Sequence, residues 1–341
     1  MKSVLLTGIT GFVGSHMADY LLEHTDYTIH ASRRWRSRDE NIKHFYGNKR
    51  VIFYEVDLMD RGSLNRFVND AKPDYVFHFA AQSFPETSFL MPVQTLQTNV
   101  VGTTNLLEEL KYAKQRGVCD PIIISVSSSE VYGMPKPEEI PIKESNPIRA
   151  ANPYSISKVG HDLMSQYYFK AYGLKIITTR MFSHEGARRG KIFALSSFAY
   201  QIALHEKDYK KHLDEHKDGC FADGAFVIKV GNLNSVRTYA HISDAVHAYW
   251  LAATKATVGE VYNIGGNYTC KVGDALDEIM SQSIIPKQCF SVFVDPDRVR
   301  PTDITLQVPD STKFSVETGW KPTIGLKPIC ADLLNYWRSI V

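Results

Sequence analysis

The sequence lacks the cysteine patterns of disulfide frameworks and zinc sites. Its cysteines number five, an odd count, and no two of them form a CxxC pair. A disulfide-stapled domain or a cysteine-based zinc site needs paired, closely spaced cysteines. We therefore expect ordinary thiols in a reducing compartment, and no bound metal.

Long apolar runs and a surplus of one charge are also missing. No apolar run approaches the roughly 18 residues of a membrane-spanning helix, and MKSVLLTG reaches its first glycine too early for the core of a signal peptide. The 39 basic and 37 acidic residues leave a net charge of only +2, which gives no general attraction to nucleic acid or anionic membranes. The expectation is a soluble, cytoplasmic protein with neither partner.

What the sequence does have is a regular alternation of two periods over its first half. With 341 residues and 44% apolar content, the chain can bury one large domain or two joined ones. Strands that alternate with helices indicate βαβ units and a parallel sheet covered on both faces. We therefore predict an α/β fold with a Rossmann-type doubly wound parallel sheet. The predicted strands are SVLLTG, TIHASR, VIFYEVDL, YVFHFA, IIISVS and KIITTRMF, with helical segments such as HMADYLLEH and TNLLEELKYAKQ between them.

The alternation fades from about residue 185. We expect residues 1–180 to form mainly the Rossmann domain and 181–341 mainly a smaller, mixed α/β lobe. The two are expected to interleave, with segments such as 230–265 returning to the first domain. The charged segment 205–219 is predicted to be a solvated surface helix or a mobile loop.

The motif TGITGFVG places Gly8, Gly11 and Gly14 between the first strand and the first helix. Glycines let the backbone approach a pyrophosphate, and a helix N-terminus offers free N–H groups. The motif predicts a dinucleotide site at this turn. We expect its other residues to be Thr7, Thr10, Phe12, Val13, Leu58, Ala80 and Ala81.

The end of the second strand, HASRRWRSR, lacks the acidic residue that would bind the adenosine ribose of NAD. Arg33, Arg34 and Arg36 stand there instead, and guanidinium groups suit a 2′-phosphate. The sequence favours NADP, with NAD as the alternative. Asp57, after the third strand, can accept a hydrogen bond from the adenine amino group.

The segment YSISK carries Tyr154 and Lys158 four residues apart, on one face of a helix. A nearby ammonium group stabilises a phenolate, so this pair suits proton transfer by the tyrosine.

Together with HFAAQS (78–83), NVVGTTNLLE (99–108) and VYNIGG (261–266), these motifs resemble the extended short-chain dehydrogenase/reductase family. Its members modify nucleotide-activated sugars. The resemblance implies that Ser128 hydrogen-bonds the sugar 4-hydroxyl and that Tyr154 removes its proton. Lys158 would hold the nicotinamide ribose and favour the Tyr154 phenolate.

The carboxylate of Glu130, two residues after Ser128, can act as a general base. Oxidation at C4 acidifies the C5 proton, and its removal leads to loss of water from C6. Epimerases of the family typically carry a small neutral residue here, whereas dehydratases and some uronate decarboxylases carry a carboxylate. A structural role, in which Glu130 caps a helix or pairs with an arginine, stays open. Ser129 stands where other dehydratases have Asp.

Three later segments resemble the GDP-mannose 4,6-dehydratase subgroup: RMFSHEGARRGKIFALSSFAYQIA (180–203), VGNLNSVRTYAHISDAVHAYW (230–250) and DPDRVRPTDI (295–304). The resemblance implies a GDP-sugar-binding lobe. Arg237 and Arg300 would bind the diphosphate, Asp303 the ribose, and the stretch from Lys229 to Asn232 the guanine. Further substrate contacts are expected from Ser83, Ser128, Ser183 and Arg189.

The departures from that subgroup cluster around the sugar. Ser128 replaces Thr, Ser183 replaces Asn, Ala187 replaces Pro, and Thr238 with Tyr239 replaces Asp-Trp. They keep the chemistry and widen the choice of sugar to GDP-mannose or a GDP-manno-heptose.

We therefore expect an NADP-dependent GDP-sugar 4,6-dehydratase that forms homodimers or homotetramers. The alternatives are a 4-dehydrogenase or epimerase that stops at the 4-ketone, a uronate decarboxylase, and a non-catalytic NADP-sensing Rossmann protein.

Overall fold

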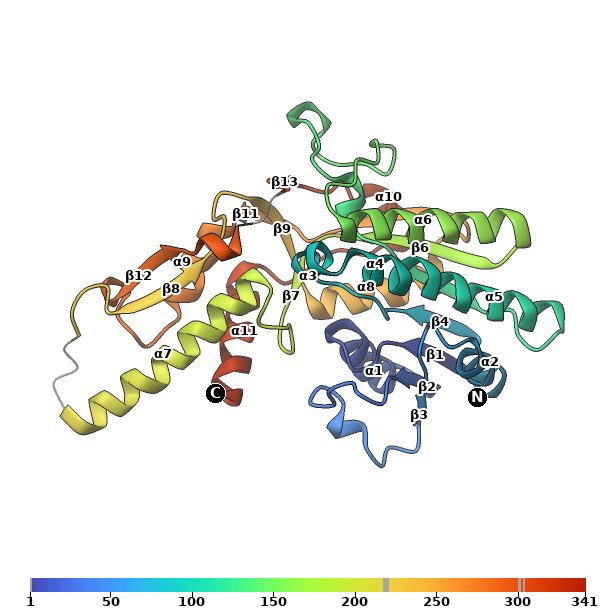
Figure 1. Cartoon of the computed structure of the whole chain (residues 1–341), viewed down its shortest axis with the longest axis horizontal. Coiled ribbons are helices and arrows are strands. Elements are labelled where there is room, and N and C mark those ends of the chain that lie inside the picture. Colours follow the sequence, from blue (N-terminus) through green and yellow to red (C-terminus); the bar gives the residue numbers. More distant parts are fainter. Residues whose placement is uncertain (1, 217–220, 300–301, 303) are drawn as a thin grey trace. The chain divides into compact units, whose positions relative to one another are not determined.

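A computed structural model describes residues 2–216, 221–299, 302 and 304–341, and divides the chain into two interleaved units (Figure 1). Unit 1 comprises the described residues up to Phe182, with Ser243–Ile264 and Pro309–Lys321. Unit 2 comprises the described residues of Ser183–Ile242, Gly265–Val308 and Pro322–Val341. Of the segment 230–265, residues 243–264 belong to unit 1 and the others to unit 2.

Unit 1 is built on a seven-stranded parallel sheet of order β10-β6-β5-β4-β1-β2-β3. The predicted Rossmann-type sheet is therefore confirmed. The strand order reverses between β1 and β4, and ligands of such sheets bind beyond the carboxyl ends of the strands at that reversal. The strands are β1 (Ser3–Thr7), β2 (Thr28–Arg33), β3 (Val51–Glu55), β4 (Tyr75–His78), β5 (Ile122–Val126), β6 (Lys175–Met181) and β10 (Val261–Ile264).

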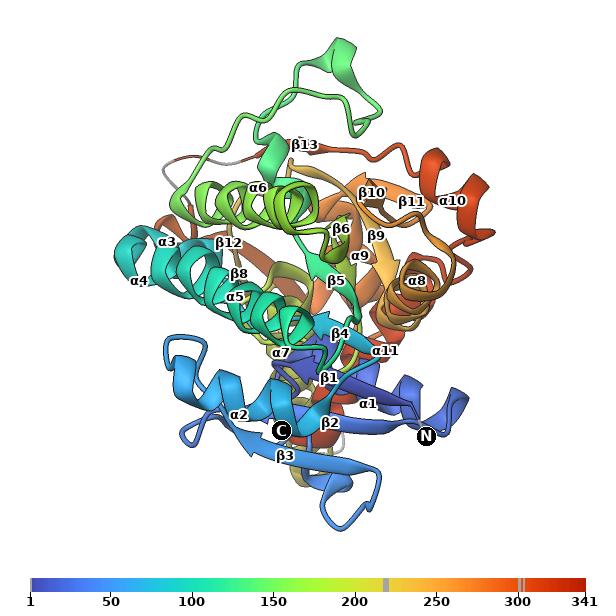
Figure 2. The ribbon, with the colours of Figure 1, turned by 90° about the vertical axis from the view of Figure 1, so that its right-hand side faces the viewer.

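Helices cover both faces of this sheet, because its strands are apolar on both sides. Figure 2 shows α2 (Arg61–Ala71), α5 (Gly102–Gln115) and α6 (Pro153–Tyr172) on one face. The other face carries α1 (Phe12–His24) and α8 (Ile242–Lys255). One apolar cluster of unit 1 packs α2 and α5 onto the sheet through side chains such as Leu5, Phe67 and Leu106.

Short elements complete unit 1. They are α3 (Pro85–Leu90), α4 (Pro92–Leu96), the π-helix η2 (Gln97–Val101), α10 (Thr312–Thr318) and the 3₁₀ turns η1 (Lys43–Phe45), η3 (Ser129–Tyr132) and η4 (Pro137–Glu139). The turn η3 follows β5 directly and packs against α6.

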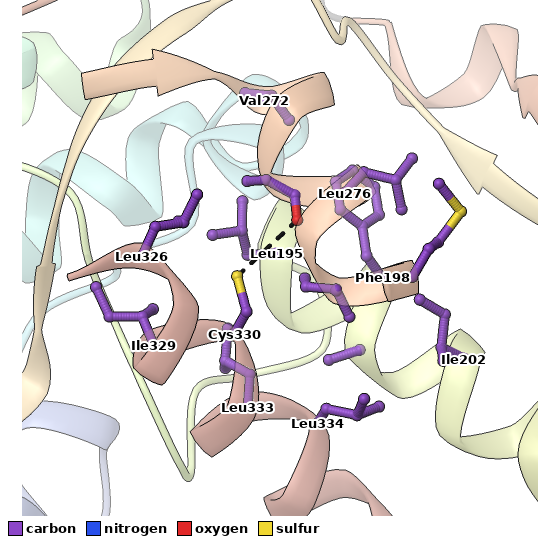
Figure 3. Packing of buried hydrophobic residues seen from close by; sticks show 14 of the residues in the cluster. Leu195, Phe198, Ile202, Val272, Leu276, Leu326, Ile329, Cys330, Leu333 and Leu334 are labelled. Atoms are coloured by element: carbon purple, nitrogen blue, oxygen red, sulfur yellow. Dashed lines mark hydrogen bonds between the residues drawn. The ribbon is translucent and has the colours of Figure 1, made fainter. Parts of the chain in front are cut away.

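The core of unit 2 lies between three helices: α7 (Ala194–His216), α9 (Val272–Ser281) and α11 (Leu326–Ile340). Figure 3 shows how apolar side chains from each helix fill this core, including Phe198, Leu276 and Leu333. The Cys330 thiol lies among them, with its sulfur 3.9 Å from the Ala275 carbonyl. The strands of unit 2 are β7 (His184–Glu185), β8 (Phe226–Val230), β9 (Val236–His241), β11 (Tyr268–Lys271), β12 (Phe290–Val294) and β13 (Leu306–Gln307), with 3₁₀ turns η5 (Lys287–Cys289) and η6 (Pro296–Arg298).

The charged segment 205–219 is helical as far as residue 216, where it continues α7, and 217–219 lie outside the described residues. The prediction that this segment is solvated is wrong in part. The helix is not solvated all round, since Tyr209 is buried. Glu206 is buried too and pairs with Arg338 of α11, whose Nε lies 2.6 Å from Glu206 Oε2. A buried carboxylate needs such a partner, and the local charge pattern does not reveal it.

Within the described part of the chain, no helix combines the length and the apolar character needed to cross a membrane.

Candidate functional site

The glycine turn after β1 has the tight geometry that its sequence predicts. Gly8 has a φ of +77°, and a Cβ there would lie 2.8 Å from the Ala80 nitrogen. A Cβ on Gly14 would lie 2.2 Å from the Gly8 oxygen. A Cβ on Gly11 would instead meet one described atom within 4 Å, Gly8 O at 3.3 Å. The chain itself therefore requires Gly8 and Gly14, whereas Gly11 leaves space beside the turn for a ligand.

Helix α1 begins at Phe12, directly after this turn, with Gly11 as its N-cap. Among the described residues, the Gly11 cap makes no side-chain capping hydrogen bond, and the first turn carries no acidic residue. Thr10 precedes the cap, and Val13 belongs to the first helical turn. The N–H groups of this first turn and the positive end of the helix dipole suit a pyrophosphate, so these residues fit a dinucleotide.

Thr7 and Ala80 tie the turn to the neighbouring strand, because the Ala80 N–H donates to Thr7 Oγ1 at 3.1 Å. Ala81 follows Ala80 beyond the carboxyl end of β4 and is partly exposed. Leu58 lies beyond β3 and is buried. All four lie at the carboxyl edge of the sheet.

The arginines at the end of β2 and just after it differ in how they are held. Arg33 Nε donates to Glu55 Oε1 at 2.9 Å, and its Nη1 donates to the Tyr46 hydroxyl at 3.1 Å. Arg34 is exposed. Asp57 is exposed beyond β3, and its Oδ1 accepts from the Met59 N–H at 2.9 Å.

The turn η3 presents Ser128 and Glu130 beyond the end of β5. Ser128 is its N-cap, and Ser128 Oγ accepts from the Glu130 N–H at 3.2 Å. The Glu130 carboxylate is half-buried, and its Oε2 accepts from Asn152 Nδ2 at 3.0 Å. Glu130 is therefore not a helix cap itself; it is held by the residue that caps α6.

Helix α6 carries Tyr154 and Lys158, as their spacing predicts. Asn152 caps its N-terminus by accepting from the Ser155 N–H at 2.8 Å, and Pro153 begins the helix. The Tyr154 N–H donates to Ser88 Oγ at 3.1 Å. Both Tyr154 and Lys158 are buried.

The Lys158 ammonium donates to the Val126 carbonyl, at the end of β5, at 2.8 Å. Burial lowers the pKa of Lys158 to about 8, and the charge of Asp162 opposes that shift. Lys158 is therefore largely charged at neutral pH and within reach of deprotonation at mildly alkaline pH.

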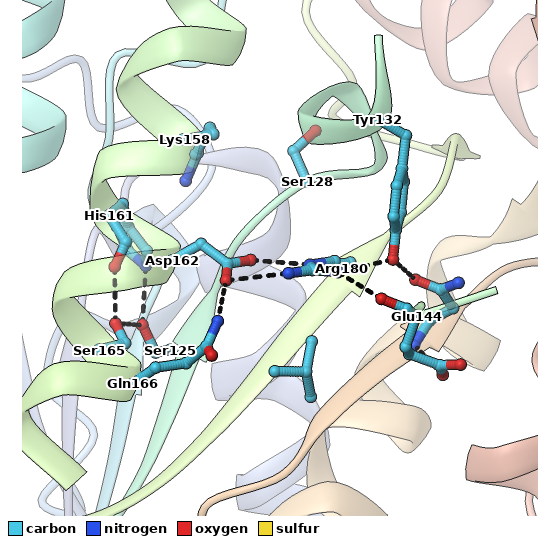
Figure 4. A network of polar contacts seen from close by, with 12 residues as sticks. Ser125, Ser128, Tyr132, Glu144, Lys158, His161, Asp162, Ser165, Gln166 and Arg180 are labelled. Atoms are coloured by element: carbon cyan, nitrogen blue, oxygen red, sulfur yellow. Dashed lines mark hydrogen bonds and ion pairs between the residues drawn. The ribbon is translucent and has the colours of Figure 1, made fainter. Parts of the chain in front are cut away.

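A second network connects η3 to α6 through the sheet (Figure 4). Arg180 on β6 pairs with Asp162 on α6, with Nε 2.9 Å from Oδ2, and its Nη1 donates to the Tyr132 hydroxyl at 2.8 Å. Tyr132 in turn donates to Asn263 Oδ1 at 2.7 Å. Burial disfavours the guanidinium, but the hydrogen bonds and charge of Asp162 outweigh it and raise the pKa of Arg180.

Sequence reasoning missed these supporting residues. Asn152 precedes the YSISK segment directly, and its amide is a good N-cap, but its contact with Glu130 spans 22 positions. Asp162 lies one turn after Lys158, so helical spacing alone could have drawn attention to it. Arg180 sits inside an apolar strand, and a buried charge in a strand calls for a partner.

In unit 2, Ser183 directly precedes the strand β7 and Arg189 lies in the segment after it. The Ser183 carbonyl accepts from the Ala240 N–H at 3.0 Å. Arg189 Nε lies 3.6 Å from Glu185 Oε2, and its guanidinium lies over the Phe193 ring. Burial raises the pKa of Glu185 to about 7, and the charge of Arg189 opposes the shift.

Lys229, Asn232 and Arg237 occupy another part of unit 2. Lys229 on β8 is exposed, and its carbonyl accepts from Arg298 Nη1 at 3.1 Å. Asn232 Oδ1 accepts from the Asn234 N–H at 2.9 Å. Arg237 Nη1 donates to the Val236 carbonyl at 3.0 Å, and its Nη2 donates to the Ile304 carbonyl.

The three remaining predicted substrate contacts lie elsewhere. Ser83 belongs to unit 1 and is exposed after β4. Arg300 and Asp303 lie outside the described residues.

Two of the residues that depart from the subgroup pattern, Ala187 and Thr238, make hydrogen bonds. The Ala187 N–H donates to Asp332 Oδ2 at 2.6 Å, a bond that a proline could not make. Thr238 Oγ1 lies 2.6 Å from Thr269 Oγ1. Tyr239 is buried in the core of unit 2, so its aromatic side chain serves packing.

The chain is similar to known proteins over nearly its whole length. A family model described as GDP-mannose 4,6 dehydratase matches residues 5–333. The GDP-mannose 4,6-dehydratase of Yersinia enterocolitica is 28% identical over 98% of this chain and 93% of its own. The GDP-6-deoxy-D-mannose reductase of Pseudomonas aeruginosa is 27% identical over 100% and 98%. The structure of RMD from Pseudomonas aeruginosa complexed with NADPH superimposes with a TM-score of 0.80 at 24% identity, covering 100% of both chains.

Proposed function

The chain belongs to the GDP-mannose 4,6 dehydratase family, and from that premise we propose that it is a GDP-sugar 4,6-dehydratase. One observation carries this proposal beyond the family. A carboxylate, Glu130, stands two residues after Ser128 at the end of β5 and is held there by Asn152, the N-cap of the helix with Tyr154 and Lys158. A reaction that stops at the 4-ketone needs no such base.

Each residue then has a defined task. Ser128 orients the sugar 4-hydroxyl, and Tyr154 takes its proton with the help of the Lys158 ammonium. A nicotinamide dinucleotide held by the glycine turn and Lys158 would supply the hydride chemistry that links C4 and C6. Glu130 removes the C5 proton and passes it to the C6 hydroxyl, which leaves as water. C5 then takes a proton that derives from solvent. The product is a GDP-4-keto-6-deoxy sugar, with no net oxidation.

We infer that the cofactor is a nicotinamide dinucleotide, and NADP rather than NAD. The support is the glycine turn at the start of α1, the exposed Arg34, and the lack of an acidic side chain at the end of β2. Tighter binding of NADPH than of NADH in a titration checks this choice.

For the sugar nucleotide we propose Ser83, Ser183 and Arg189 as sugar or phosphate contacts. Arg237 and Arg300 would bind the diphosphate, Asp303 the ribose, and Lys229 with Asn232 the guanine. The departures at Ser183, Ala187, Thr238 and Tyr239 leave GDP-mannose and GDP-manno-heptose as candidates. A screen for a 4-keto product that includes both GDP-mannose and GDP-manno-heptose separates these candidates, and UDP-, dTDP- and CDP-sugars in the same screen test the nucleotide.

The second candidate is a family member that only oxidises, reduces or epimerises at C4, and the similarity to a GDP-6-deoxy-D-mannose reductase favours it. Incubation with GDP-mannose or GDP-manno-heptose in deuterated water distinguishes the two. A dehydratase yields a 4-keto-6-deoxy product with deuterium at C5. A product that keeps its 6-hydroxyl would overturn the proposal.

Glu130→Gln tests the base directly. Elimination should fall by roughly 10²–10⁴-fold, the usual contribution of general acid–base catalysis, while reduction of the cofactor by the sugar stays measurable. A Glu130→Gln enzyme with wild-type dehydration would remove Glu130 from the mechanism.

We further propose a cytoplasmic homodimer or homotetramer. Helix α6 presents Ile156, Leu163 and Tyr167 to solvent on one face, and a second copy of the chain offers the same face.

A further inference from the structure

A chain of hydrogen-bonded hydroxyls and imidazoles runs through the buried interior of unit 1. Thr7 Oγ1 lies 2.8 Å from His78 Nδ1, and His78 Nε2 lies 3.0 Å from Thr103 Oγ1. Thr103 Oγ1 also lies 2.9 Å from His161 Nδ1, and His161 Nε2 lies 2.7 Å from Ser125 Oγ. All five side chains are buried. The chain joins β1, β4 and β5 to α5 and α6, and none of its histidines has a task in the proposed reaction.

The direction of each hydrogen bond follows from Thr103. Its hydroxyl donates its single proton to the Asn99 carbonyl at 2.7 Å, so its oxygen must accept from both rings. His78 therefore carries its proton on Nε2, and His161 carries its proton on Nδ1. In the other tautomer, either ring would present an unprotonated nitrogen to the Thr103 oxygen, and the hydrogen bond between them would be lost.

The outer ends of the chain agree with this assignment. Thr7 Oγ1 already accepts from the Ala80 N–H at 3.1 Å, so its own proton is available to His78 Nδ1. Ser125 Oγ lies 2.7 Å from both His161 Nε2 and Ser165 Oγ. It donates to His161 Nε2 when the Ser165 hydroxyl donates to Ser125 instead of to the His161 carbonyl, which is 2.9 Å away. Every ring nitrogen then has a partner while both rings are neutral.

Burial and the charge of Lys158 keep both rings neutral. Asp162, which follows His161 on α6, is itself paired with Arg180 on β6. Burial lowers the pKa of His78 to about 3, and burial lowers the pKa of His161 well below its usual value; the Lys158 charge adds to both shifts. The two rings lie parallel, with centroids 5.5 Å apart.

We propose that His78 and His161 are positioning residues for the proposed dehydratase, acting as neutral rings of fixed and opposite tautomer. They join the glycine turn, through Thr7, to the helix that carries Tyr154 and Lys158. His161 lies one turn after Lys158 and bonds to Ser125 of β5, three residues before Ser128; Figure 4 shows this end of the chain. The arrangement fixes the reacting side chains against the cofactor turn without adding a positive charge beside Lys158. The kinetic part of this inference rests on the proposed function.

The tautomers can be read directly by NMR of the full chain with ¹⁵N-labelled histidine rings, recorded with and without NADP. His78→Gln and His161→Gln samples assign the two rings. We expect a protonated Nε2 in His78 and a protonated Nδ1 in His161, unchanged from about pH 5 to about pH 9, where an ordinary histidine titrates. A ring that titrates in this range, or shows the opposite tautomer, overturns the inference.

Thr103 offers a matched pair of variants for the positioning role. Thr103→Ser keeps the hydroxyl and should retain both tautomers and a kcat within about twofold of wild type. Thr103→Val removes the acceptor of both ring N–H groups. It should change the ring signals and lower kcat by roughly tenfold, with KM within about threefold, because misplaced reacting groups slow the chemical step more than binding.

A folded Thr103→Val enzyme with wild-type kcat overturns the positioning role. If Thr103→Val does not fold, a Thr103→Ser enzyme with lost tautomers or lost kcat does the same. A wild-type chain that converts no sugar nucleotide contradicts the proposed function and the positioning role together, whereas wrong tautomers in an active enzyme contradict the hydrogen-bond chain alone.

Discussion

Asn152 joins two features that are usually separate, a helix cap and the support of a catalytic carboxylate. Its Oδ1 accepts from the Ser155 N–H, and its Nδ2 donates to Glu130 Oε2 at 3.0 Å. The same amide therefore fixes the start of the helix that carries Tyr154 and the position of the proposed C5 base. A serine or aspartate could provide the cap alone.

Two substitutions separate these tasks. Asn152→Ser keeps a capping oxygen but loses the amide donor, so stability should stay near wild type while C5 deprotonation slows by roughly tenfold. Asn152→Asp also keeps the cap and places a second carboxylate beside Glu130. It should move the acidic limb of the pH–rate profile to higher pH, because like charges disfavour ionisation. Rates of C5 deuterium incorporation across pH, with urea unfolding as the control, measure both effects; unchanged profiles in both variants would exclude the role.

At the scale of single residues, the sequence predicts the features that depend on neighbouring positions in the chain. Gly8 and Gly14 follow from the strand–turn–helix pattern, and Tyr154 with Lys158 from helical spacing. The partners of these residues could not be predicted, because each contact joins distant positions. His78 and Thr103 are 25 residues apart, and Thr103 and His161 are 58 apart. Only the packing of α5 and α6 on the sheet brings these side chains together.

At the scale of elements, the Arg180–Tyr132 contact determines how η3 meets the sheet. Tyr132 closes the turn that carries Glu130, and it bridges Arg180 of β6 and Asn263 of β10. The turn is therefore anchored by a strand pair of the sheet and not by its own short backbone.

Tyr132→Phe removes this anchor with little change in volume. We expect a loss of about 1–3 kcal/mol in the free energy of unfolding, because a buried guanidinium and a buried amide each lose a partner, together with slower C5 deuterium incorporation. Tyr268→Phe is the matched control, since Tyr268 is exposed on β11. Equal losses in the two variants would contradict the anchoring role.

The buried histidines of β4 and α6 also predict how stability responds to acid. An unfolded histidine binds a proton below about pH 6.5, whereas His78 does so only near pH 3 and His161 well below its usual value. Between these limits the unfolded chain holds more protons, so each ring lowers the free energy of unfolding by about 1.4 kcal/mol for every pH unit of acidification. Glu185, with a pKa raised to about 7, acts in the opposite direction.

The difference between wild type and His161→Asn isolates one ring, because Asn keeps a donor at the Nδ1 position. When urea unfolding is measured from pH 7 to pH 5, the free energy of unfolding should fall less steeply for the variant than for wild type. The difference between the two slopes corresponds to about one proton. A slope that His161→Asn does not alter would show that His161 is protonated in the native state.

The whole chain combines a family fold with local departures. The sequence predicts the sheet of unit 1 because each βα segment shows its own period. It fails for α7, whose charged surface pattern hides Glu206 and its partner Arg338, 132 positions away. The interleaving of the units follows from the same cause: Ser243–Ile264 and Pro309–Lys321 join unit 1 through pairing and packing across long sequence separations.

At the scale of the whole molecule, the exposed surface of α6 predicts that the chain assembles with a second copy of itself. Ile156, Leu163 and Tyr167 are each about half exposed, at 51%, 52% and 51%, and recur at i, i+7 and i+11 on one helix face. Val93 of α4 and Val101 of η2, elements that pack against α6, are exposed as well. Exposed apolar side chains gathered on one face mark an interface, and a two-fold axis would pair this face with itself.

Leu163→Glu should therefore weaken the assembly, because two-fold symmetry would place two buried carboxylates near each other. Light scattering during size-exclusion chromatography at micromolar concentration should show the wild type as a dimer or tetramer and the variant as a smaller species. Val316→Glu, on the exposed face of α10 at 81% exposure, is the control and should keep the wild-type mass. A wild-type chain that is monomeric throughout, or a Leu163→Glu variant of undiminished mass, would show that this face is not the interface.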